Sequence, residues 1–113
     1  MTEGLPTRPE RRRYQRCVVG IPVQAVRPDA PQDDPRRVIG LHILDLSRGG
    51  AGAASQEALE QDQALILLFP PVGSGKGRDT PGQVVRCDGR GSHYAVGIAF
   101  EEPWPEYEEI RVG

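Results

Sequence analysis

The sequence predicts an all-β protein: a six-stranded antiparallel β-barrel followed by a short C-terminal helix. The chain of 113 residues has the length of a single domain. Its 14 glycines and 11 prolines interrupt the sequence too often for long helices and suit short strands joined by turns. Six short runs rich in Val, Ile, Leu and Ala lie between them. Because a sheet of six strands avoids exposed edges most simply by closing on itself, these runs favour a barrel.

The first two strands are expected at 17–26 and 38–47, joined by a polar, proline-rich hairpin loop. Pro22 indicates an edge position or a bulge in the first strand, because proline cannot donate to the hydrogen-bond ladder. In the second strand the apolar alternation changes parity before Asp45. Either that strand is buried on both faces or a bulge shifts it before Asp45, and the sequence leaves both interpretations open.

The other four strands are shorter and are separated by turns or loops. Segment 55–63 could hold one helical turn or form a loop, and the glycine-rich stretch 71–82 is expected to be a mobile loop. The sixth strand alternates large residues, which we expect in the core, with small residues that would let another group approach the backbone closely. The four strands are expected at 51–55, 63–69, 83–87 and 92–100, and the last has Tyr94, Val96, Ile98 and Phe100 on its large face and Ala95, Gly97 and Ala99 on its small face.

The domain organisation follows from these elements. We expect a flexible N-terminal tail at 1–10, a barrel domain at 11–102 that includes an arginine arm at 11–16, and a short C-terminal helix or tail at 103–113. In this last segment, apolar residues recur at helical spacing and could fold back to cap an open end of the sheet. These residues are Trp104, Tyr107 and Ile110.

The net charge of −2 hides an asymmetry along the chain. Residues 1–16 carry five arginines against two glutamates, whereas residues 101–113 carry five glutamates against one arginine. A protein that coats nucleic acid is expected to be basic along one broad face, so this short basic arm fits a small anionic ligand better. No run approaches the about 20 apolar residues of a membrane helix, and the N-terminus lacks the apolar stretch of a secretory signal. We therefore expect a cytoplasmic protein without membrane insertion.

The residues that could catalyse a reaction or bind a metal form no recognisable motif. Cys17 and Cys87 lie far apart without a second pair for zinc, and we expect small buried side chains in a reducing compartment. His42 and His93 lie within strand patterns. The stretch 73–80 is not a phosphate-binding loop, because a glycine follows its lysine and no helix follows the loop. We expect neither an enzyme nor a metal site, and no cofactor.

Two segments carry chemistry that fits together. Arg12 and Arg16 form an R-x-x-x-R spacing before the first strand, and Asp45, Ser47 and Gly50 form a D-x-S-x-x-G spacing at the end of the second. In an extended strand Asp45 and Ser47 project from the same face, so a carboxylate lies beside a hydroxyl. The carboxylate can accept the N1–H and N2–H₂ donors of a guanine, and Gly50 allows a sharp turn or the close approach of a flat ligand.

The arginines supply the complementary donors. A guanidinium is a planar fork that binds phosphate, or guanine O6 and N7, in bidentate fashion and also stacks on rings. Arg11 and Arg13 lie beside the spacing and are expected to add phosphate contacts. Arg86, in the fifth strand, could stack on a ligand or be an ordinary exposed strand arginine, and the same alternatives apply to Arg48.

With the R-x-x-x-R spacing followed by the D-x-S-x-x-G spacing, the sequence resembles a PilZ domain, the bacterial receptor module for cyclic di-GMP. The resemblance covers roughly residues 10–102 and rests on RRYQR and DLSRGG, with weaker similarity in GQVVRC and VGIAF. It implies a split-barrel type of six-stranded antiparallel barrel whose two motifs close around cyclic di-GMP. Carried over, the paired arginines are Arg12 and Arg16, and the partners from the strand and turn are Asp45, Ser47 and Gly50.

The expected function is a cyclic di-GMP receptor that orders its arginine arm when the ligand binds. It would then signal through contacts with a protein partner in motility, pilus or exopolysaccharide machinery. Two alternatives remain open. A PilZ-like adaptor would bind protein partners without nucleotide, although the five intact motif positions argue against it. A small barrel that binds single-stranded nucleic acid would stack bases on exposed aromatics, and only Tyr14 lies near the basic run.

Overall fold

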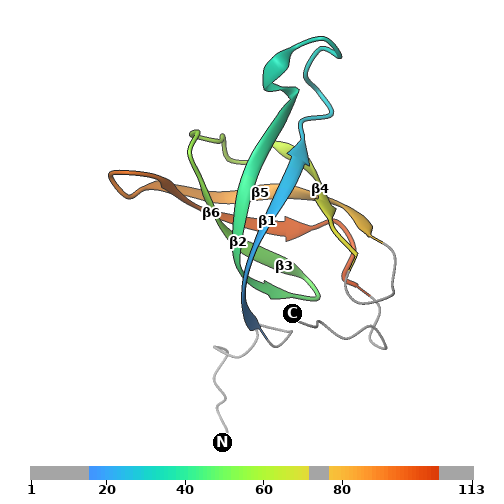
Figure 1. The fold of residues 1–113 in the computed structure, drawn as a ribbon, viewed down its shortest axis with the longest axis vertical. Helices are drawn as coiled ribbons and strands as arrows, with labels where there is room; N and C mark the ends of the chain where they lie inside the picture. Colours follow the sequence, from blue (N-terminus) through green and yellow to red (C-terminus); the bar gives the residue numbers. More distant parts are fainter. Residues whose placement is uncertain (1–15, 72–76, 105–113) are drawn as a thin grey trace, which may run out of the picture.

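The computed structural model describes residues 16–71 and 77–104, and these residues form a closed antiparallel β-barrel (Figure 1). Around the barrel the strands follow the order β1, β2, β3, β6, β5, β4, and β4 pairs in turn with β1. The expected all-β, six-stranded antiparallel fold is confirmed. The strands are β1 (Cys17–Val26), β2 (Val38–Ser47), β3 (Gly50–Ser55), β4 (Ala64–Phe69), β5 (Arg78–Gly89) and β6 (Tyr94–Phe100).

The barrel closes through a short seam between β1 and β4. β1 pairs with β2 over most of its length but with β4 only through residues 24–26. Pro22 therefore lies where β1 pairs with β2 alone, so the N–H that proline lacks is not needed for a second ladder. The β1–β2 register also shifts between Val18 and Ile21. The edge position and the nearby irregularity both agree with what Pro22 predicts.

β5 is longer than the sequence predicts, because it begins at Arg78 rather than at residue 83. Pro81 and Gly82 are typical turn residues, and they make this stretch look like a loop. In the structure, residues 78–81 pair with β4 beyond the point where Phe100 of β6 meets Gly82. A proline is tolerated in this extension because β4 is its only strand partner among the described residues.

The loop between β3 and β4 contains no helix. Segment 55–63 runs through bends and a turn, and Leu59 from this loop is buried in the core. The loop was one of the two alternatives that its sequence allows. Within residues 16–71 and 77–104 the helical element is a single 3-10 turn, Pro35–Arg37, in the β1–β2 hairpin.

Both expected terminal segments fall largely outside the described residues. Pro103 and Trp104 are not helical, and the remainder of the helix or tail expected at 103–113 lies outside the description, as do the tail at 1–10 and residues 11–15 of the arm. These expectations stay predictions. In the part of the chain that is described, no helix is long and apolar enough to cross a membrane.

A β-bulge explains the change of parity in β2. The pairing of β2 with β3 shifts between Ile43 and Asp45, so Leu44 is one extra residue in β2. Ile43 before the bulge and Leu46 after it are both buried, whereas Asp45 is half-exposed. Of the two interpretations that the sequence allows, the bulge is therefore the correct one.

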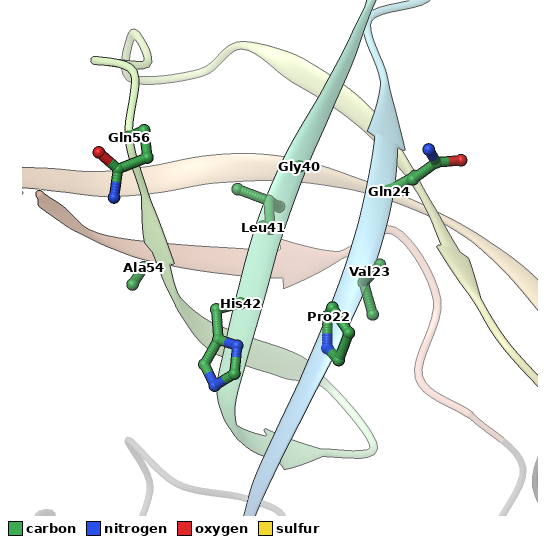
Figure 2. A pocket seen from close by; sticks show the side chains of 8 residues that line it. All are labelled: Pro22, Val23, Gln24, Gly40, Leu41, His42, Ala54 and Gln56. Atoms are coloured by element: carbon green, nitrogen blue, oxygen red, sulfur yellow. The ribbon is translucent and has the colours of Figure 1, made fainter.

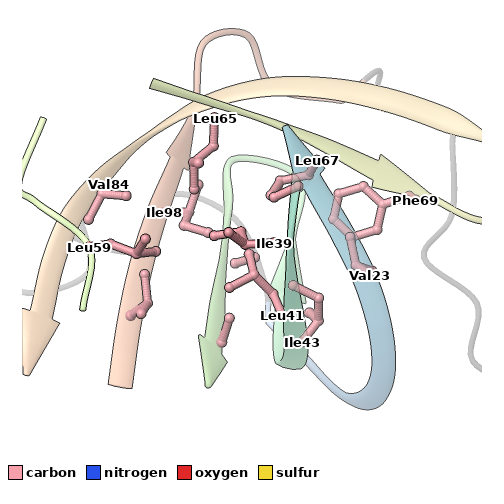
Figure 3. Close-up of a cluster of buried hydrophobic side chains, with 14 of the residues drawn as sticks. Val23, Ile39, Leu41, Ile43, Leu59, Leu65, Leu67, Phe69, Val84 and Ile98 are labelled. Carbon is pink, nitrogen blue, oxygen red and sulfur yellow. The ribbon is translucent and has the colours of Figure 1, made fainter. Parts of the chain in front are cut away.

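The core is one cluster of mainly aliphatic side chains to which every strand contributes (Figure 3). The expected large face of β6 lies inside, since Val96, Ile98 and Phe100 are buried and Tyr94 packs against the cluster from its margin. Complete burial of such a side chain contributes about 1.5–3 kcal/mol to stability. The largest side chains that are almost fully shielded are Ile43, Leu65, Leu67, Val84 and Val96.

Aromatic rings cover the end of the core where β4 and β6 finish. Trp104 stacks on Phe100 with a centroid distance of 5.5 Å, and it meets Phe69 at 5.2 Å in an edge-to-face arrangement. Its indole Nε1 donates to Thr80 Oγ1 at 3.2 Å, and the Arg78 guanidinium lies 5.0 Å from the centroid of the indole. Trp104 therefore folds back over the sheet as the sequence predicts.

Replacing Leu67 with Ala is expected to lower the free energy of unfolding by about 2–5 kcal/mol, because the side chain is 0% exposed and its removal leaves a cavity. The matched control is Leu44→Ala, the same chemical change at a residue that is 43% exposed, with an expected loss of about 0.5 kcal/mol. Urea unfolding followed by the fluorescence of Trp104 measures both. Equal losses in the two variants would contradict this assignment of the core.

Candidate functional site

The two sequence motifs meet at the start of β1. Arg16 directly precedes β1, and Val18, two residues later, pairs with Asp45 of β2. This register brings the Arg16 side chain to Asp45, where Nη1 donates to Oδ1 in an ion pair. The two side chains remain 40% and 35% exposed. A ligand can therefore reach both charged groups from solvent.

The bulge in β2 directs Asp45 toward β3. Asp45 pairs with Gly52 across the β2–β3 ladder, and its carboxylate lies above that glycine. A Cβ at Gly52 would be only 2.7 Å from Oδ2 and 3.1 Å from Oδ1. The absence of a side chain at Gly52 is therefore what allows the Asp45 carboxylate to occupy this position.

Ser47 takes part in the turn between β2 and β3. Its side chain is buried, and its hydroxyl accepts a hydrogen bond from the Gly49 N–H at 3.2 Å and donates to the Gly50 carbonyl at 3.4 Å. The sequence predicts instead a hydroxyl that projects beside Asp45. The structure directs it into the turn, because a serine there can satisfy nearby backbone groups. A contact between Ser47 and a ligand stays a prediction.

Gly50 is required by the packing of the turn against β6. A Cβ at this position would lie 2.5 Å from the carbonyl oxygen of Ile98. Next to it, the Phe100 N–H donates to the Gly49 carbonyl at 2.9 Å. The last glycine of the D-x-S-x-x-G spacing therefore lets the turn approach β6 closely, and the approach of a flat ligand to Gly50 stays a prediction.

The other arginines of interest lie in different places. Arg48 donates from Nε to the Trp104 carbonyl at 2.7 Å, and its own carbonyl accepts from the Trp104 N–H at 2.8 Å. Arg48 therefore holds the C-terminal part of the barrel to the β2–β3 turn. Arg11, Arg12 and Arg13 lie outside the described residues, so their part in the site stays a prediction.

Arg86, for which the sequence leaves two interpretations open, lies on the same outer surface as Asp45. It follows a bulge in β5, pairs with Gly97 of β6, and forms an ion pair with Asp88 at 3.5 Å. Gly52 and Gly97 were not singled out as site residues. Their outward positions could have been found from the small residues that alternate with buried ones in β3 and β6.

A separate hollow of about 380 Å³ lies on the outer face of β1, β2 and β3 (Figure 2). It lies farther along these strands than Asp45. Gly40 and His42 both line it, and no atom lies within 4 Å of where a Cβ of Gly40 would be. None of the predicted site residues lines it. The candidate site is therefore separate from this hollow. Within residues 16–71 and 77–104, no group of three or more His, Cys, Asp or Glu side chains could hold a metal ion.

Replacing Gly50 with Ala is expected to destabilise the protein by more than about 1 kcal/mol, because the new Cβ would collide with backbone rather than with a movable side chain. The matched control is Gly40→Ala, where no atom lies within 4 Å of the new Cβ. Its stability should stay the same or rise by about 0.4–1 kcal/mol, since alanine reduces the entropy of the unfolded chain. Thermal unfolding measures both, and a Gly50→Ala variant as stable as wild type would refute the close approach.

Comparison with known proteins points to one family and one fold. The model of the PilZ domain family matches residues 10–111. The inhibitor of motility MotI/DgrA from Bacillus subtilis is structurally similar, with a TM-score of 0.60 and 18% identity over 81% of this chain and 43% of that one. The PilZ domain of YcgR from Escherichia coli with c-di-GMP gives a TM-score of 0.57 and 18% identity over 80% of this chain and 78% of that one.

A second structure of Escherichia coli YcgR, also in complex with c-di-GMP, gives a TM-score of 0.55 and 22% identity over 80% of this chain. This chain spans 38% of that protein chain and 43% of the MotI/DgrA chain. A search of curated proteins gives no significant match. At these identities the structural similarities establish the shared barrel fold.

Proposed function

This chain belongs to the PilZ domain family, and from that premise we propose that it is a receptor for cyclic di-GMP. The observation that carries the proposal is the contact between Arg16 and Asp45. It joins one residue from each of the two motifs on an exposed surface of the barrel. Receptor and effector domains of this kind act by binding, so we propose a signalling role rather than catalysis, in the cytoplasm where the sequence leads us to expect the protein.

The chemistry of the pair suits a guanine nucleotide. Asp45 receives Arg16 at Oδ1, while Oδ2 lies above Gly52. A carboxylate has about four lone-pair sites, so it can accept guanine N1–H and N2–H₂ while it keeps an arginine partner. A guanidinium has five N–H donors, and Arg16 uses Nη1 toward Asp45. Its fork is suited to bind a phosphate of the same ligand.

We further propose that ligand binding orders the arginine arm at 11–16 over the barrel. Arg11, Arg12 and Arg13 are neighbouring like charges, and the two phosphates of cyclic di-GMP would neutralise their repulsion. Such a switch requires contacts that exist only with ligand, and phosphate contacts of the arm would supply them. The surface formed by the ordered arm would then be presented to a protein partner.

Arg16→Ala and Asp45→Asn are each expected to weaken the binding of cyclic di-GMP about tenfold or more, since a hydrogen bond to a charged group contributes about 1.5–3 kcal/mol. Isothermal titration calorimetry measures the affinities. Arg90→Ala is the matched control, because Arg90 is an exposed arginine in the β5–β6 turn and its loss changes the net charge as Arg16→Ala does. The proposal fails if the wild-type protein releases no heat at micromolar ligand.

Hydrogen exchange tests the ordering of the arm. Amides of residues 11–16 are expected to exchange more slowly when the protein is saturated with cyclic di-GMP, because the contacts with phosphate would hold the arm on the barrel. The amides of β4, which pairs with β1 only through residues 24–26 at the end remote from Arg16, are the internal control and should not change. Unchanged exchange at 11–16 in a protein that binds the ligand would show that the arm takes no part in a switch.

The choice of partner is a separate proposal. One structural neighbour is named an inhibitor of motility, which supports a search among motility proteins, and pilus and exopolysaccharide machinery are further candidates. A ligand-gated receptor predicts that the partner binds only in the presence of cyclic di-GMP. An adaptor that works without nucleotide predicts equal partner binding in both conditions. Pull-down with wild type and with Asp45→Asn, each with and without ligand, separates the two.

A further inference from the structure

Arg86 and Asp45 lie in one continuous row across four strands. Asp45 in β2 pairs with Gly52 in β3, Gly52 pairs with Gly97 in β6, and Gly97 pairs with Arg86 in β5. An acidic and a basic side chain thus lie on either side of two neighbouring glycines. The register of the barrel alone brings them together, since they are far apart in the sequence.

A β-bulge precedes each of the two charged residues, Asp45 and Arg86. β2 has one extra residue, Leu44, relative to its partner β3, and β5 has one extra residue, Val85, relative to its partner β6. A bulge turns the next side chain to a new direction. Leu44 and Val85 are accordingly exposed, at 43% and 47%, and the residue after each bulge is the charged one.

The charged groups lie above the paired glycines. Oδ2 of Asp45 is 2.7 Å from where a Cβ of Gly52 would be, and Cζ of Arg86 is 3.5 Å from where a Cβ of Gly97 would be. Opposite residues of an antiparallel pair have Cα atoms about 4.5–5.5 Å apart. A carboxylate and a guanidinium therefore lie in neighbouring positions above the two glycines, where one ligand can contact both.

Resting on the proposed function, we propose that Asp45 and Arg86 bind the same guanine of cyclic di-GMP. Asp45 accepts hydrogen bonds from N1–H and N2–H₂, and Arg86 donates to O6 and N7, the acceptor pair that arginine binds in bidentate fashion. In adenine an amino group replaces O6, so a donor would face the donors of Arg86. Arg86 is thus a specificity-determining residue of the site.

The ion pair between Arg86 and Asp88 does not prevent Arg86 from binding a base. Nε of Arg86 lies 3.5 Å from Oδ2 of Asp88, and the two side chains are 61% and 47% exposed. An exposed ion pair of this kind is weak because both groups are well hydrated. The guanidinium can leave Asp88, or keep this contact while it also donates to a base, when a ligand arrives.

The test measures atom-specific coupling between Arg86 and the base. Calorimetry compares cyclic di-GMP with its analogue in which 7-deazaguanine replaces guanine and the N7 acceptor is missing. Wild type is expected to bind cyclic di-GMP about tenfold or more tightly than the analogue. Arg86→Ala should bind both equally, and Arg86→Lys should lose most of the preference, because an ammonium cannot form the fork.

Arg90→Ala, with the same charge change on an exposed arginine, should keep the wild-type ratio. An unchanged thermal unfolding midpoint shows that Arg86→Ala is folded. If Arg86→Ala keeps the wild-type preference for cyclic di-GMP over the analogue, this inference is overturned and the receptor function stands. If wild type binds neither ligand, the proposed function and this inference are both overturned.

Discussion

The bulge at Leu44 in β2 is the constraint on which the rest of the structure depends. It allows one strand to supply Ile43 and Leu46 to the core and still turn Asp45 outward. If residues 43–45 formed a regular strand without the bulge, strict alternation would place Asp45 on the same face as Ile43, and a carboxylate in the aliphatic core would carry a large desolvation cost. The irregularity in the ladder therefore reconciles a stable core with a charged outer surface.

The β2–β3 turn connects this strand to the C-terminal part of the barrel. Ser47 satisfies backbone groups within the turn, and Gly50 allows it to approach β6. The Arg48 side chain donates a hydrogen bond to the carbonyl of Trp104, and the ring of Trp104 covers the end of the core. The D-x-S-x-x-G spacing thus has a clear structural role in addition to any contact with ligand, and the site rests on a well-supported part of the barrel.

The candidate site is a set of partly exposed charged side chains. It is formed by side chains on the outer face of a barrel whose interior is filled, and its charged groups lie above two neighbouring glycines. The two glycines let the Asp45 carboxylate and the Arg86 guanidinium lie close to the sheet, so that donors and acceptors on neighbouring edges of one planar ligand can meet both groups. The base of a nucleotide is planar and can have donors and acceptors on neighbouring edges.

The fold class was predictable from the sequence because turn residues and short apolar runs are local signals. Pro22 and the large and small faces of β6 were predicted for the right physical reasons. The start of β5 was not, because Pro81 and Gly82 resemble a turn, and only the pairing with β4 shows that they belong to a strand. The part that Arg12 and the other arm residues before position 16 play in binding stays a prediction.

Within the site, residue types and spacing in the sequence are enough to predict that Arg16 and Asp45 have the right chemistry. How these side chains are arranged follows from the three-dimensional pairing of the strands. The contact between Arg16 and Asp45, the inward turn of the Ser47 hydroxyl, and the placing of Arg86 beside Gly97 all depend on register between strands that are distant in the chain. Local sequence patterns carry the period of a strand, but they do not carry its register against other strands, and a single bulge changes both.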